Sequence, residues 1–110
     1  MRTILIYKNH FTEFYQDQTE TVKKKIDWTI ALVRDLDQIP AKYFKHIQSV
    51  AGLYEIRVHA NSNIFRIFCF FDQGNIIVLG NGFQKKMQKT PKNELDQALK
   101  IMKQYFNEKG

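Results

Sequence analysis

Apolar and polar residues follow a strand-like pattern through the central part of the chain, from Gly52 to Pro91. The first run, Tyr54 to His59, alternates strictly between apolar and polar residues, so its polar side chains are expected to form an exposed row opposite a core. The second run, Ile64 to Phe71, and the third, Asn75 to Phe83, are more continuously apolar. Short connections rich in Asn and Gly separate the three runs, which predicts an antiparallel meander.

The segment before the meander has helical periodicity. Between about Thr12 and Asp37, apolar residues recur at spacings of three and four, and Trp28 and Leu32 are expected to widen this stripe. Thr19 is a candidate N-cap for a second helical segment, because Glu20 follows in its first turn. The pattern therefore predicts one long amphipathic helix or a pair of helices.

The two ends of the chain complete the fold prediction. Thr3 to Tyr7 is typical of a strand, and Thr90 and Pro91 are expected to be the N-cap and first residue of a last helix, with a frayed tail over 107–110. The element order predicts a single α+β domain over residues 1–110. Its long N-terminal helix (or helix pair) and its C-terminal helix pack on one face of a twisted antiparallel sheet, and the opposite face stays partly open.

Charge and cysteine usage narrow the function classes. Lys and Arg outnumber Asp and Glu by 17 to 11, giving a net charge of +6, a balance expected of proteins that meet phosphate backbones or acidic partners. The single cysteine, Cys69, lies in an apolar run and is expected to be a buried structural thiol. No metal-ligand spacing, signal-peptide core or membrane-length apolar stretch is present. We therefore expect no metal, no cofactor, no membrane partner and a cytoplasmic location.

Several charged residues of the predicted sheet are candidates for a site. Arg66 is the one charge inside the second apolar run, so it needs an anionic partner, a ligand or contact with solvent. Lysines at 85, 86 and 89 follow the third run and precede a helix N-terminus, a position that favours phosphate. The remaining candidates are Glu55, Arg57 and His59 on the exposed row, and Lys23, Lys24 and Lys25 on the long helix as a solvated face or a contact to ribosomal RNA phosphates.

Three segments carry a family resemblance: GLYEIRV, then FRIFCFFD, then VLGNGFQKKMQKTPKNELDQA. In this order and spacing the chain resembles the RelE/ParE superfamily of bacterial toxins, and most closely its phage-related, HigB-like branch. The resemblance covers nearly the whole chain and implies a RelE-like fold. It also implies the toxin of a type II toxin-antitoxin pair, whose partners are a HigA-like helix-turn-helix antitoxin, mRNA on the ribosome and ribosomal RNA. Most members are ribosome-dependent endoribonucleases, and a minority inhibit DNA gyrase.

The resemblance also implies roles for individual residues. Arg57 matches the position of a base or proton acceptor, Arg66 matches a phosphate clamp, and Lys85 and Lys86 match a clamp or proton donor. Some members carry a tyrosine or histidine near the start of the final helix, where this chain has Lys89, Thr90 and Pro91. The general acid is therefore unassigned by the resemblance.

Metal-independent RNA cleavage needs a proton acceptor, a proton donor and cations that stabilise negative charge. Arginine stays protonated and is a poor base, so Glu55 and His59 are the chemically capable acceptors, while Arg66 and Lys86 suit charge stabilisation. Glu55 is alternatively only an ion-pair partner of Arg57, Arg66 or a lysine, and His59 only a solvent-facing strand end. A gyrase inhibitor of the same fold and a non-catalytic RNA- or protein-binding module are the other functions consistent with these residues.

Overall fold

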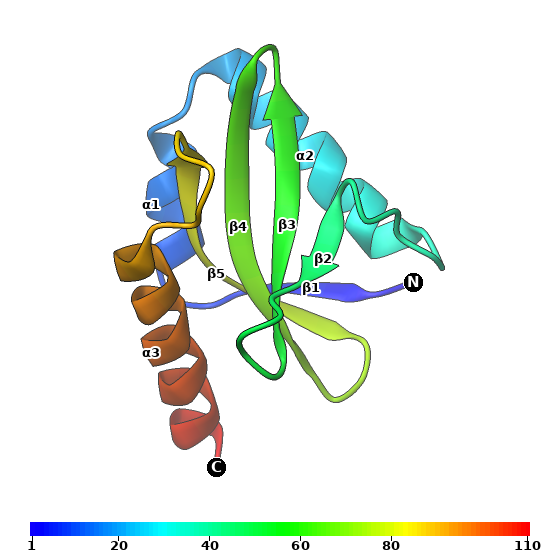
Figure 1. Ribbon diagram of the computed structural model, residues 1–110. Coiled ribbons are helices and arrows are strands. Elements are labelled where there is room, and N and C mark those ends of the chain that lie inside the picture. The colour runs from blue at the N-terminus through cyan, green and yellow to red at the C-terminus, as the bar shows by residue number, and fades with distance from the viewer.

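The computed structural model describes residues 1–110 and contains one five-stranded sheet and three helices (Figure 1). In chain order the elements are β1 Thr3–Ile6, α1 His10–Gln16, α2 Glu20–Asp35, β2 Phe44–His46, β3 Leu53–Ala60, β4 Asn63–Asp72, β5 Ile76–Lys85 and α3 Lys92–Lys109. The strands lie in the order β1-β5-β4-β3-β2. The pairs β2–β3, β3–β4 and β4–β5 are antiparallel, and β1 runs parallel to β5.

The α+β class and the three-stranded meander are confirmed, but the predicted wholly antiparallel sheet is wrong. Strand β1 adds to the free edge of β5 in the parallel direction, with Thr3 opposite Ile76. Phe44–His46 forms a further strand against β3, in a segment where the sequence pattern predicts no strand. Three residues are too few to show a period of two, so this strand has no pattern of its own.

Helices cover both faces of the sheet, which corrects the prediction that they pack on one. Helices α1 and α2 pack on the face that holds Ile56, Ile67 and Leu79, while α3 packs through Ala98 and Ile101 on the opposite face. The continuous apolar run of β4 allows this, because a strand buried on both faces needs apolar residues at every position. In Figure 1, α2 lies behind the sheet and α3 in front, and the ends of β3 and β4 nearest their connecting turn extend beyond α3.

The helical region before the meander is two helices, and the cap at Thr19 is confirmed. The hydroxyl oxygen of Thr19 accepts a hydrogen bond from the backbone N–H of Val22 at 3.3 Å. Trp28 corrects the predicted apolar stripe, because 47% of its surface is exposed. It lies two positions from the fully buried Ile26, which places it about 200° around the helix, away from the core.

The C-terminal helix differs from its prediction at both ends. Pro91, not Thr90, is the N-cap, and no side chain caps the helix. The tail is not frayed, because Lys109 Nζ lies 2.6 Å from the carboxylate of Asp72, and the Tyr7 hydroxyl donates to Glu108 at 2.6 Å. None of the three helices is long and apolar enough to span a membrane.

Gly82 on β5 provides a test of the packing of α1. A methyl group at this position would overlap the ring of Phe14. We expect Gly82→Ala to lower the free energy of unfolding by about 1–3 kcal/mol, the range for overpacking, as measured by thermal denaturation followed by circular dichroism. Phe14→Leu in the same chain relieves the overlap, so the double variant should lose less than the two single variants together. An unchanged melting temperature for Gly82→Ala would contradict this close packing.

Candidate functional site: a cationic cluster on β3 and β4

Four charged or titratable side chains gather on the α3 side of the sheet, close to the β3–β4 turn. The ladder pairs Arg57 with Arg66 and His59 with Ile64, and directly opposed residues of an antiparallel pair share a face. Glu55, Arg57 and His59 of β3 therefore lie on one face with Arg66 of β4. In Figure 1 no helix crosses this end of the sheet in front of β3 and β4.

Glu55 holds the two arginines together. A single carboxylate oxygen, Oε2, lies 2.7 Å from Nε of Arg57 and 3.3 Å from Nε of Arg66. Glu55 and Arg66 are only 5% and 7% exposed, so the predicted exposed position of Glu55 is wrong. Its alternation with apolar neighbours is as predicted, but the two guanidinium groups shield the carboxylate from solvent. The trio carries one carboxylate for two arginines and keeps one positive charge.

Arg66 retains unused hydrogen-bond capacity. The only hydrogen bond of its side chain is a long one, 3.4 Å from Nη1 to the carbonyl oxygen of Phe65, and its buried Nε contacts Glu55 as an ion pair without hydrogen-bond geometry. Burial lowers the pKa of Arg66, and the charge of Arg57 adds to this effect against the attraction of Glu55. A guanidinium so placed is suited to bind an oxyanion, since its planar fork meets two oxygens at once.

His59 is held in its neutral form beside these cations. Its pKa is lowered below the usual 6.5, first by burial and then by the positive charges of Arg66, Lys42, Arg57 and Lys25. The Nδ1 atom is buried and has no hydrogen-bond partner in the protein. A neutral imidazole at pH 7 has one nitrogen free to accept a proton, so His59 is chemically able to act as a general base.

The lysines after β5 are only partly brought to this face. Lys85 ends the strand opposite Ile64, and its ammonium group donates to the carbonyl oxygen of Gln88 at 2.7 Å, which closes the turn. Lys86 and Lys89 are exposed in the connection to α3 and form no ion pair. The loop thus adds unpaired positive charge at the end of β5, next to the strand that carries Arg66.

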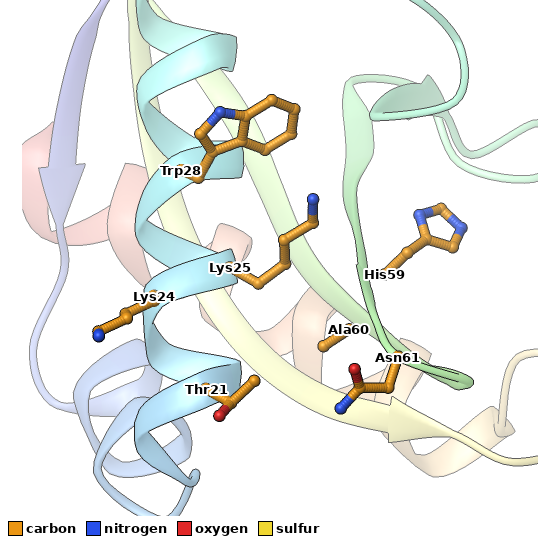
Figure 2. Close-up of a pocket in the computed structure, with 7 residues that line it drawn as sticks. All are labelled: Thr21, Lys24, Lys25, Trp28, His59, Ala60 and Asn61. Atoms are coloured by element: carbon orange, nitrogen blue, oxygen red, sulfur yellow. The ribbon is translucent and has the colours of Figure 1, made fainter.

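The lysines of α2 lie apart from the arginine cluster. Lys23 Nζ is 3.7 Å from Glu20 and lies over the ring of Tyr15. Lys24 and Lys25 line a cleft of about 510 Å³ between α2 and the end of β3. The other lining residues are Thr21, Trp28, His59, Ala60 and Asn61 (Figure 2). Sequence reasoning missed this cleft, although the position of Trp28 on the polar side of its helix was a usable signal.

Thiol chemistry and metal binding have no cluster of residues to support them. Cys69 is fully buried, and burial raises the pKa of its thiol, in agreement with the expected structural role. No three His, Cys, Asp or Glu side chains gather in an arrangement that could hold a metal ion.

The mixed five-stranded sheet with helices on its two faces is consistent with a RelE-like fold. The chain matches the family of phage-derived Gp49-like proteins over residues 13–103. It therefore belongs to that family, a toxin-like family related to the RelE and HigB toxins. No curated protein matches the chain.

The buried trio makes a prediction about stability. We expect Glu55→Gln to lower the free energy of unfolding by about 3 kcal/mol, because it leaves two arginines close together without a neutralising charge. Urea denaturation measures this loss. Glu20→Gln is the matched control, because the Glu20 side chain is 83% exposed and its pair with Lys23 should contribute less than about 1 kcal/mol. Equal effects of the two substitutions would contradict a buried trio.

The environment of His59 predicts its titration. We expect the NMR signals of its imidazole to titrate with a midpoint below 6.5, because burial and four cations disfavour the charged ring. Since the folded-state pKa lies below the unfolded one, His59 contributes stability that is present above pH 6.5 and lost as the pH falls through the folded-state pKa. Lys25→Gln should move the midpoint upward, whereas Lys100→Gln, on the exposed side of α3, should not. A midpoint at or above 6.5 in the unsubstituted protein would refute this environment.

Proposed function

We propose that the protein is the toxin of a type II toxin-antitoxin pair of the HigB kind, and that it inhibits translation by cutting mRNA on the ribosome. The observation that carries the proposal is the arginine pair around Glu55, beside a neutral imidazole on an uncovered sheet face. This arrangement combines an anion-binding group with a proton acceptor. Membership in a toxin-like family also supports a toxin function.

The proposed reaction is an intramolecular phosphoryl transfer. His59 accepts the proton of the ribose 2′-hydroxyl, whose oxygen attacks the adjacent phosphorus while the bond to the 5′-oxygen of the next nucleotide breaks. The leaving oxygen takes a proton from an ammonium group of the loop after β5, and we assign this role to Lys86. The products are a 2′,3′-cyclic phosphate and a free 5′-hydroxyl, so no net proton is consumed.

The arginines stabilise the transition state in this proposal. Arg66 contacts the non-bridging phosphate oxygens, where charge accumulates, through its Nη2 group, which forms no hydrogen bond within the protein. Arg57 fixes the position of Glu55 and adds to the positive field, and it does not abstract a proton because a guanidinium stays protonated. Glu55 acts as a positioning residue, since both its arginine partners are held through one oxygen.

The proposal also includes the partners. The mRNA strand enters on the uncovered face of β3 and β4, and Lys85, Lys89, Lys23 and Lys24 contact RNA phosphates of the message or of the ribosome. A cognate HigA-like antitoxin silences the toxin by covering this basic face or by preventing its entry into the ribosome. Both processes belong in the cytoplasm.

The proposal predicts loss of toxicity with single substitutions. We expect expression of the unsubstituted chain to arrest growth and to produce breaks within translated codons of a reporter transcript, detected by primer extension. Arg66→Ala and Lys86→Ala should reduce the cleavage rate by at least about 100-fold, the cost of removing a transition-state stabilising group. His59→Ala should give a similar loss, because no other neutral base lies on this face.

Two controls separate chemistry from folding and from other functions. Lys100→Ala removes a lysine from the exposed side of α3 and should leave cleavage unchanged, and Arg66→Lys keeps the charge but loses the planar fork, so it should recover only part of the activity. Circular dichroism confirms that each variant is folded. Growth arrest with intact transcripts would instead indicate a gyrase inhibitor, and normal growth would indicate a non-catalytic binding module.

A further inference from the structure

The cleft between α2 and the end of β3 has the composition of a nucleotide site. Its volume, about 510 Å³, lies within the roughly 300–1,000 Å³ range of small-molecule sites. Trp28 stands at its rim with 47% of its surface exposed, and Tyr43 supports the indole by an edge contact at 5.5 Å. An exposed tryptophan held by its neighbour offers an aromatic surface at low conformational cost.

The positive charge in this cleft is not neutralised by the protein. Lys24 and Lys25 form no ion pair, because the two acidic residues nearest in sequence are engaged elsewhere: Glu20 with Lys23, and Asp27 with the hydroxyl of Tyr15 at 2.9 and 3.0 Å. The ammonium group of Lys25 instead lies 4.2 Å from the centre of the Trp28 ring. This ammonium group lies over the exposed ring and has no carboxylate partner, so the pair offers a contact to a phosphate and a contact to a base of one nucleotide.

Polar side chains without partners complete the site. Figure 2 shows Lys25, Thr21 and Asn61 directed between α2 and the end of β3, while Lys24 points away from the strand. Neither Thr21 nor Asn61 uses its side chain in a hydrogen bond within the protein, although both line the cleft. A hydroxyl and an amide are free to bond to ribose or to a base edge.

The cleft and the arginine cluster meet at His59 of β3. His59 is one of the residues that line the cleft, and in Figure 2 its imidazole points away from α2. The charges of both Lys25 and Arg66 act on this imidazole. A polynucleotide that crosses the end of β3 would therefore contact the cleft on one side of the strand and the arginine cluster on the other.

We propose that this cleft binds one nucleotide of single-stranded RNA, with its base against the Trp28 indole and its phosphate on Lys25. The inference rests on the proposed function, in that RNA is the substrate, and it makes this nucleotide the neighbour of the one that is cut. A duplex segment of ribosomal RNA would bind differently. Its phosphates would contact Lys25, but its paired and stacked bases would not stack on the Trp28 indole.

Because Trp28 is the single tryptophan of the chain, its fluorescence reports directly on the cleft. We expect an eight-nucleotide, fully 2′-O-methylated RNA, which has no attacking hydroxyl, to quench this fluorescence. Anisotropy of the dye-labelled oligonucleotide then gives the affinities of variants. Trp28→Ala should weaken binding at least about fivefold, the lower limit for loss of one base stack, and Trp28→Phe should restore most of it. Lys25→Gln should weaken binding and reduce the slope of log affinity against log salt by about 0.7.

The control variant is Lys100→Gln, which removes the same charge from α3 and should change affinity less than about twofold, leaving only the general electrostatic effect. Three results would each overturn the inference. The first is absence of quenching, and the second is equal effects of Lys25→Gln and Lys100→Gln. The third is an RNA duplex that binds as tightly as the single strand and is insensitive to Trp28→Ala. Quenching together with intact transcripts in the expression experiment would reject the nuclease proposal and leave the cleft supported. Transcript cleavage combined with RNA binding that does not depend on Trp28 or Lys25 would support the nuclease proposal and reject the cleft.

Discussion

The carboxylate of Glu55 between Arg57 and Arg66 is the interaction on which the candidate site depends. Arg66 lies in a strand whose other central residues are apolar, and it is only 7% exposed. A charge in that position is tolerated because an opposite charge on the adjacent strand compensates for lost hydration. One carboxylate cannot neutralise two guanidinium groups, so a positive charge remains and N–H groups of Arg66 stay available. The ion pair between Glu55 and Arg66 makes a buried arginine compatible with the sheet and still leaves Arg66 able to bind an anion.

The arrangement of helices decides which part of this sheet is available to a large ligand. Helix α3 covers Phe68 and Phe70 of β4, whereas the end of β4 near Arg66 lies beyond the helix. At the opposite end of β4, Lys109 and Tyr105 both donate hydrogen bonds to the carboxylate of Asp72 at 2.6 Å, and these bonds fix α3 in this position. Helix α3 thus covers only part of this face. The residues of β4 under the helix belong to the rigid core, and those beyond it contribute to the cationic surface.

Local features were predictable from the sequence, and features that depend on distant pairing were not. The Thr19 cap and the turn before Asn75 are encoded within a few residues, and Gly74 adopts the positive φ angle that such a turn requires. The parallel pairing of β1 with β5 joins segments that are far apart in the chain, and no short-range pattern specifies it. The candidate residues Glu55, Arg57 and Arg66 were all identified from the sequence. The burial of Glu55 was missed, because it follows from the register that sets Arg57 opposite Arg66.

The distribution of charge around His59 connects the two halves of the proposed surface. Arg57 and Arg66 on one side and Lys25 and Lys42 on the other all disfavour a proton on the same imidazole. Like charges held this close destabilise the folded protein, and no nearby carboxylate other than Glu55 relieves the repulsion. A bound polyanion would relieve it at both positions at once. Binding energy gained at the cleft can therefore position the phosphate at Arg66, while the imidazole between them stays neutral and able to accept a proton.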